Sequence, residues 1–289
     1  MFGQLSAYAL TPLVNERLDS NAFARVIEPL VAAKVPCISV LGSTGCAPYL
    51  TLADRNDAAK MAISIAGDIP VMVGISAIAT RDVLMLAEKA QQAGAKGLLV
   101  APLSYQPLQE QEVFGLYQQL NQQVSIPICV YENPRTTQFH FSDALRLQLA
   151  QLPWIKAFKI PGLNGELIKR LAPQLPSDIS LGVAGDALAA NAIVEGAAHW
   201  HSVLAGTFPA PCMAISQLLF AGNNKQGLAQ ARSLAPLWAL FSQYGSLKVM
   251  AVAASLMGVA AQTLPKPLLA ISEKGKNEVY GVLKACEWL

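Results

Sequence analysis

The fold is indicated most clearly by residues 126–160, which read IPICVYENPRTTQFHFSDALRLQLAQLPWIKAFKI. The stretch begins and ends with short apolar runs, 126–131 and 155–160, and such runs are typical of buried strands. Between them, Ser142 stands directly before a helical pattern, in the position of an N-cap. Two strands joined by a helix form a parallel βαβ unit with a right-handed crossover.

The same alternation of strand and helix extends through the first 220 or so residues. Thr51 followed by Asp54 predicts a capping box, Asp186 predicts an N-cap, and Gly94 and Gly196 predict the C-terminal ends of helices. No Gly-x-Gly-x-x-Gly follows the first strand, which disfavours an open doubly wound sheet. We therefore predict an α/β protein with a (β/α)8 TIM barrel. Its strands are expected at residues 5–10, 37–41, 71–75, 97–101, 126–131, 155–160, 179–183 and 200–204.

The strand pattern stops at about residue 222. Residues 1–222 are expected to form the catalytic barrel, and residues 223–289 a C-terminal helical extension packed on it. Helices are predicted at 226–242 and 247–257. The second of these has no clean polar face, which is typical of a helix buried in a larger body or against another subunit.

Composition restricts the partners and the compartment. Hydrophobic residues make up 53% of the chain, charged residues 14%, and the net charge is +2. With no run of lysine or arginine, this disfavours nucleic acid or an anionic membrane as the main partner. No secretory signal and no apolar segment of membrane-spanning length are visible. The five cysteines show no Cys-x-x-Cys spacing, which favours free thiols in the cytoplasm.

Lys159 is the strongest candidate for a catalytic residue. It lies at the end of an apolar strand, where desolvation favours the neutral amine. A neutral lysine amine attacks carbonyl carbon and forms a Schiff base. Tyr131 ends the preceding strand and is therefore expected beside Lys159. Lys156, the alternative nucleophile, has the opposite strand parity and should face the helices or the bottom of the barrel.

A loop of small residues, Gly42-Ser-Thr-Gly45, follows the second predicted strand. Its hydroxyl groups can donate hydrogen bonds to a carboxylate, although an ordinary turn is an alternative explanation. In a barrel with eight strands this loop lies across the mouth from Lys159. A small keto acid attached to Lys159 can then be held by Ser43 and Thr44.

Several motifs follow one another along nearly the whole chain: Thr11-Pro12, Gly42-Ser-Thr-Gly45, Tyr131-x-x-Pro134, Ala157-Phe-Lys159, Ala184-Gly-Asp186 and Lys248…Gly258…Leu264-Pro-Lys-Pro-Leu268. In this order they resemble the dihydrodipicolinate synthase / N-acetylneuraminate lyase family. The resemblance implies a Schiff-base-forming pyruvate aldolase or lyase (a class I enzyme) that needs no metal or organic cofactor. It also implies a homotetramer whose small-molecule partners are a 2-keto acid, pyruvate, and an aldehyde.

The resemblance assigns roles to individual residues. Lys159 would form the imine, Tyr131 would relay protons, and Thr44 would belong to that relay. Ser43, Thr44 and Val203 would bind the substrate.

Departures from the family's pattern bear on the substrate. Cys46 and Ile160 stand where the synthase branch has acidic residues. Ser104 stands at the position of an inter-subunit tyrosine, and Tyr105 is one place further on. Arg135 is displaced from the position of a substrate-binding arginine. These departures favour a 2-keto-3-deoxy sugar acid as the substrate over a role in lysine biosynthesis. The alternatives are dihydrodipicolinate synthase itself, a catalytically silent keto-acid-binding member and a metal-dependent barrel aldolase.

Two other residue types invite a functional interpretation. Cys46 is a candidate reactive thiol, but a packing or specificity contact is the favoured role because no histidine accompanies it. His199 and His201 share one strand face, which could hold a metal, but His140 is the only other histidine and no His-x-x-Glu pattern is present, which disfavours a zinc site. His201, near the mouth, is also a candidate for contact with substrate.

Overall fold

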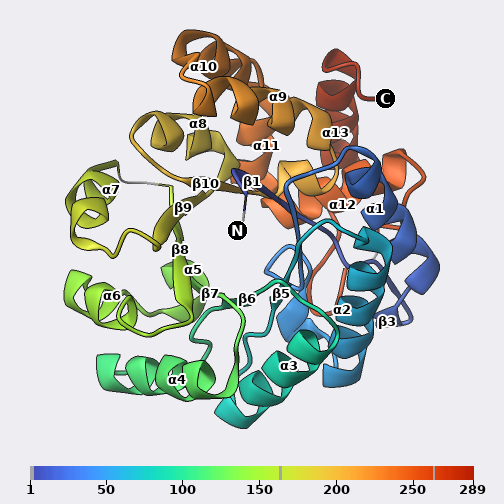
Figure 1. Cartoon of the computed structure of the whole chain (residues 1–289). Coiled ribbons are helices and arrows are strands. Elements are labelled where there is room, and N and C mark those ends of the chain that lie inside the picture. The colour runs from blue at the N-terminus through green and yellow to red at the C-terminus, as the bar shows by residue number, and fades with distance from the viewer. Residues whose placement is uncertain (1–2, 163–164, 263) are drawn as a thin grey trace.

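The computed structural model describes residues 3–162, 165–262 and 264–289 (Figure 1). Within these residues, parallel strands close into a barrel in the order β1-β10-β9-β8-β7-β6-β5-β4, and β1 pairs with β4 to complete the ring. The predicted (β/α)8 barrel is confirmed. Its strands are β1 (Leu5–Tyr8), β4 (Cys37–Val40), β5 (Val71–Gly74), β6 (Gly97–Val100), β7 (Ile128–Tyr131), β8 (Ile155–Pro161), β9 (Ser180–Ala184) and β10 (His199–Ser202).

Helices surround the barrel, as Figure 1 shows. The helices that alternate with the strands are α1 (Ser20–Ala32), α2 (Leu52–Ala66), α3 (Thr80–Gln92), α4 (Glu110–Gln123), α6 (Asp143–Leu149), α7 (Gly165–Leu171), α8 (Asp186–Val194) and α9 (Pro209–Phe220). A small hairpin, β2 (Leu13–Val14) and β3 (Arg17–Leu18), follows β1. The short helix α5 (Pro134–Thr137) follows β7, and single turns of 3-10 helix lie at Ala47–Tyr49, Ala172–Gln174 and Leu204–Gly206.

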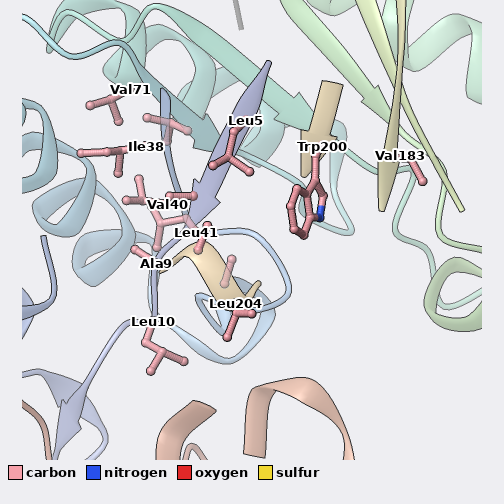
Figure 2. Close-up of a cluster of buried hydrophobic side chains, with 14 of the residues drawn as sticks. Leu5, Ala9, Leu10, Ile38, Val40, Leu41, Val71, Val183, Trp200 and Leu204 are labelled. Carbon is pink, nitrogen blue, oxygen red and sulfur yellow. The ribbon is translucent and has the colours of Figure 1, made fainter. Parts of the chain in front are cut away.

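The strands are buried on both faces, which explains the apolar composition. Outward-facing side chains such as Leu5, Ile38 and Trp200 come from the neighbouring strands β1, β4 and β10 (Figure 2). They belong to the large core between strands and helices. The alternate positions point into the barrel, where a second, smaller cluster lies. Its buried members are Tyr8, Cys37, Met72, Leu99, Cys129 and Ala157.

Most of the predicted helix ends are confirmed. Thr51 and Ser142 accept hydrogen bonds from the backbone of α2 and α6, at 3.1 Å each. Gly94 and Gly196 directly follow the C-caps of α3 and α8, with φ angles of 100° and 109°. Glycine adopts these angles without the steric cost that a side chain would bring.

The prediction of one helix over 226–242 is wrong. Two helices, α10 (Asn224–Ser233) and α11 (Ala235–Tyr244), meet at Leu234. Pro236 stands in the first turn of α11, where its missing N–H costs no helical hydrogen bond. The periodicity of apolar residues continues across the break, so the pattern alone did not reveal it.

The C-terminal helices also include α12 (Ser246–Leu256) and α13 (Glu273–Ala285). Leu237, Val249 and Val279 belong to the same hydrophobic cluster as the barrel, and α10 contacts α8 and α9. The division at residue 222 remains a prediction. Among the described residues, no helix has both the length and the apolar character needed to cross a membrane.

Candidate active site

The carboxyl ends of the barrel strands surround a cavity of about 960 Å³. Active sites of (β/α)8 barrels lie at this end of the strands. The residues predicted from the sequence as site residues all line the cavity: Ser43, Thr44, Tyr131, Lys159 and Val203.

Lys159 points into the barrel from β8 and is only 5% exposed. Burial lowers the pKa of its amine below the usual range, and the neighbouring Tyr131 partly offsets that effect. The Nζ atom lies 3.8 Å from the centre of the Tyr8 ring and 3.9 Å from that of Tyr131. The geometry therefore provides what a nucleophilic lysine needs, a buried amine that opens onto a cavity.

Tyr131 is the direct register partner of Lys159 on the neighbouring strand β7. Its hydroxyl oxygen accepts a hydrogen bond of 3.0 Å from the side-chain amide of Asn133 and lies 3.4 Å from the Ser43 hydroxyl. Because Asn133 donates to the oxygen, the Tyr131 O–H remains available to donate to Ser43 or to a substrate. The sequence analysis did not identify Asn133, although its position two residues after Tyr131 was a signal.

The loop after β4 turns tightly beside Tyr131. A Cβ atom on Gly45 would lie 2.7 Å from the backbone nitrogen of Leu41, so only glycine fits there. Within this loop the Ser43 side chain is exposed and that of Thr44 is buried. Both residues line the cavity.

A buried ion pair supports the ends of β7 and β8. Arg146 contacts both carboxylate oxygens of Glu132 at 2.9 and 2.7 Å, and it also binds Asp143. The backbone N–H of Glu132 donates to the carbonyl of Lys159 at 2.9 Å. This pair therefore fixes the backbone between Tyr131 and Lys159, a role that the sequence analysis missed. A carboxylate directly after a buried strand was the available signal.

The prediction that Asp186 is an N-cap is wrong. Gly185 is the N-cap of α8, and Asp186 is the first helical residue. Its carboxylate instead accepts hydrogen bonds from the Ser202 hydroxyl at 2.5 Å and the Val203 backbone at 3.1 Å. Burial raises the pKa of this carboxyl group, and the hydrogen bonds from β10 oppose the shift. Asp186 thus fixes the position of Val203 at the cavity wall.

Comparison with known proteins shows the family of the chain. The model of the Dihydrodipicolinate synthetase family matches residues 1–286. The chain belongs to this family. A dihydrodipicolinate synthase structure from Agrobacterium tumefaciens is 36% identical, with a TM-score of 0.96 and 98% of both chains covered. A 4-hydroxy-tetrahydrodipicolinate synthase from Rickettsia typhi is 25% identical over 98% of this chain and 97% of its own length.

Membership of the dihydrodipicolinate synthetase family makes the chain an enzyme of the lyase class. Its fold is also that of a dihydrodipicolinate synthase structure from Thermotoga maritima, with a TM-score of 0.94, 25% identity and full coverage of both chains. The family is thus the one that the sequence motifs resembled.

Three residues that bear on the departures from the family's pattern, Ser104, Tyr105 and Arg135, differ in their relation to the cavity. Tyr105 is 88% exposed and does not line the cavity, and neither does Ser104. Arg135 does line the cavity and is exposed, so a cation is present at the rim.

The other candidates have structural partners. Lys156 forms an ion pair with Asp178 on the outside of the barrel, as its parity predicted. Burial raises the pKa of the Cys46 thiol to about 12, which disfavours a reactive thiolate. His199 bonds to Gly3 and Ser180. Within residues 3–162, 165–262 and 264–289, no group of three or more His, Cys, Asp or Glu side chains could hold a metal ion.

Proposed function

We propose that the protein is a pyruvate-dependent aldolase or lyase that works through a Schiff base on Lys159. The observation that carries this proposal is a buried amine with a lowered pKa, opening onto the cavity beside the hydroxyl of Tyr131. A neutral amine in such a place is an activated nucleophile toward a ketone.

The proposed reaction begins when the Lys159 nitrogen attacks C2 of pyruvate. The C–N bond forms, the ketone oxygen leaves as water, and one proton is taken up to give the protonated imine. Loss of a proton from the methyl carbon gives an enamine, which attacks the carbonyl carbon of an aldehyde. The aldehyde oxygen takes up a proton, and water hydrolyses the imine to release the 2-keto acid. Cleavage follows the same steps in reverse.

Tyr131 and Thr44 are proposed to carry the protons of these steps. The Tyr131 hydroxyl is joined to the loop after β4 through Ser43, which gives a proton a short path between the cavity and the loop. Ser43 and Thr44 are also proposed to bind the pyruvate carboxylate, with Val203, directly after β10, contacting the substrate.

The second substrate is proposed to be the aldehyde half of a 2-keto-3-deoxy sugar acid or a similar compound. Pyruvate has only six heavy atoms, so a cavity of about 960 Å³ leaves most of its space for another molecule. Hydroxyl and amide side chains line that space, and they suit a polyhydroxylated partner. These hydroxyl and amide side chains belong to Ser76, Asn133, Thr136, Ser242 and Ser246.

The alternative function is that of 4-hydroxy-tetrahydrodipicolinate synthase, the name carried by the Rickettsia typhi relative. Pyruvate and aspartate semialdehyde would then be the substrates, and a coupled reductase would detect the product. Turnover in that assay, without turnover of sugar-derived aldehydes, would favour the alternative. Binding of pyruvate without turnover of any aldehyde would indicate a catalytically silent member.

The decisive experiment is treatment with pyruvate and sodium borohydride, followed by mass spectrometry of the intact chain and its peptides. We expect one reduced adduct, located on Lys159. Lys159→Ala should lose both the adduct and turnover and retain the fold, whereas the matched control Lys156→Ala should retain both. An unaltered mass, or an adduct on another amine, would contradict the proposal.

A homotetramer is the proposed assembly, on the basis of the family resemblance. Analytical ultracentrifugation at micromolar concentration should then give one species of four chains. A monomer under these conditions would contradict that part of the proposal.

A further inference from the structure

Two aromatic side chains lie beside Lys159 and belong to none of the family's motifs. Tyr8 comes from β1 and is 2% exposed, and His201 comes from the adjacent strand β10 and is 1% exposed. A hydrogen bond of 3.1 Å joins the Tyr8 hydroxyl to Nδ1 of His201. The two rings also meet edge to face, with centroids 5.8 Å apart.

The Lys159 nitrogen lies between two aromatic faces. It is 3.8 Å from the centre of the Tyr8 ring and 3.9 Å from that of Tyr131. The face of an aromatic ring carries partial negative charge and attracts a cation placed over it. A protonated imine carries its positive charge on this same nitrogen, so the charge develops between the two rings.

We propose that Tyr8 is a further catalytic residue, whose ring face stabilises the protonated imine on Lys159, and that His201 is the positioning residue that orients this ring. The inference rests on the proposed function, because it requires an imine at Lys159. It adds to that function a second ring, besides that of Tyr131, that supports the cation from which the enamine forms.

The surroundings of His201 suit a neutral positioning group. Burial, followed by the charge of Lys159, lowers the pKa of His201 well below its usual value. A neutral imidazole can bind Tyr8 without placing a second positive charge near the imine. Gly182 makes room for this ring, because a Cβ atom there would lie 2.3 Å from Nε2 of His201.

The Nε2 atom of His201 is buried and has no hydrogen-bond partner among the described residues. A buried polar atom without a partner costs free energy, and such atoms persist where another role holds the side chain in place. The bond between Nδ1 and Tyr8 is that role in this proposal.

The contrasting explanation is that Tyr8 only fills the barrel. An apolar side chain of similar size would then serve equally well, whereas the proposal requires an aromatic face. Tyr8→Phe keeps the face and loses the bond to His201, and Tyr8→Leu loses both. These two variants therefore separate packing from catalysis.

The experiment titrates pyruvate against each variant, reduces the imine with borohydride and measures the trapped fraction by intact mass. A cation over an aromatic ring is worth a factor of roughly 3 to 30 in an equilibrium constant. We expect Tyr8→Leu to weaken imine formation by about this factor, and Tyr8→Phe by less than about threefold. If Tyr8→Leu fails to fold, Tyr8→Met replaces it, because methionine fits irregular gaps.

The role of His201 is tested by a double-mutant cycle. His201→Leu should cause the same small loss of imine formation as Tyr8→Phe. The double variant Tyr8→Phe/His201→Leu should lose no more than either single variant, since both substitutions remove the same bond. Tyr117→Leu is the matched control. Tyr117 is fully buried and bonds to the Val100 carbonyl at 2.7 Å, away from the cavity. Tyr117→Leu should lower the free energy of unfolding without changing imine formation.

Equal imine formation in Tyr8→Leu and Tyr8→Phe would overturn the role of the ring, and additive losses in the cycle would overturn the role of His201. Absence of an adduct in the unmodified protein would instead refute the proposed function. The two failures are therefore distinguishable.

Discussion

Lys159 can act as a nucleophile only while its amine is uncharged. In water a lysine amine is protonated at neutral pH, since its pKa is about 10.4. Burial in the barrel lowers that pKa because the charged form loses its hydration. Tyr131 partly opposes the shift. In the proposed function, the ring faces of Tyr8 and Tyr131 beside the Lys159 nitrogen would attract the cationic imine.

The direction of this shift predicts how imine formation depends on pH. At a pH below the pKa of Lys159 in the folded protein, the amine is protonated and cannot act as a nucleophile. The rate of trapping should therefore rise with pH and level off above that pKa. We expect the midpoint to lie below the ordinary pKa of a lysine amine. The check is the initial rate of adduct formation at low pyruvate concentration, measured across a pH series. A midpoint at the ordinary lysine value would contradict the buried amine.

Tyr131→Phe tests the proposed proton relay. The variant keeps the ring face over Lys159 and removes only the hydroxyl that contacts Ser43 and Asn133. A positioned acid-base group contributes about 10²- to 10⁴-fold, so kcat should fall by this factor. Borohydride trapping at equilibrium should change far less, because the imine itself can still form. An unchanged kcat would remove Tyr131 from the mechanism.

The sequence was sufficient to predict that Lys159 and Tyr131 lie side by side at the cavity, because strand parity and the succession of strands are local properties. The pairing of Tyr8 with His201 was not predictable in this way. It joins side chains separated by 193 positions, and it exists only because the barrel closes between β1 and β10. Asp186 was misassigned for a similar reason, since its partners come from the end of β10 and the residue that follows it.

At the scale of the elements, the strands were predicted well and the connections less well. Each strand ends within two residues of the end of its predicted run. Five strands (β1, β4, β5, β6 and β10) end one or two residues earlier, because the last residues of these runs enter the loops above the barrel. Apolar periodicity also continued across the break at Leu234. The ion pair between Glu132 and Arg146 links the end of β7 to α6, so its effect on the site depends on both elements.

Replacing Arg146 with Met should destabilise the protein strongly. The change leaves the Glu132 carboxylate, whose side chain is only 8% exposed, without its partner. Loss of one member of a buried ion pair costs about 3–5 kcal/mol. Replacing both residues, in Glu132→Gln/Arg146→Met, should recover part of that loss because no buried charge remains. Urea denaturation measures both effects, and a loss below about 1 kcal/mol in the single variant would show that the pair is not needed.

At the scale of the whole molecule, the barrel and the C-terminal helices share one hydrophobic cluster. Phe208, before α9, stacks on Trp288 with ring centroids 4.6 Å apart. Arg25 of α1 donates to the Val259 carbonyl at 2.9 Å. The cavity also draws part of its wall from α11 and α12, through Trp238, Phe241 and Leu247. The predicted boundary at residue 222 therefore divides regions that pack as one body.

A chain ending at residue 222 should for this reason fail to fold cooperatively. Truncation exposes the apolar surfaces of α8 and α9 and removes one wall of the cavity, so we expect aggregation and no pyruvate adduct on Lys159. The full chain should unfold in a single transition, with circular dichroism and tryptophan fluorescence coinciding. Trp288→Leu is the milder variant, and it should lower the free energy of unfolding by about 1–3 kcal/mol with the adduct retained. A truncated chain that is monomeric, cooperative and labelled by pyruvate would establish the barrel as an independent domain and contradict this prediction.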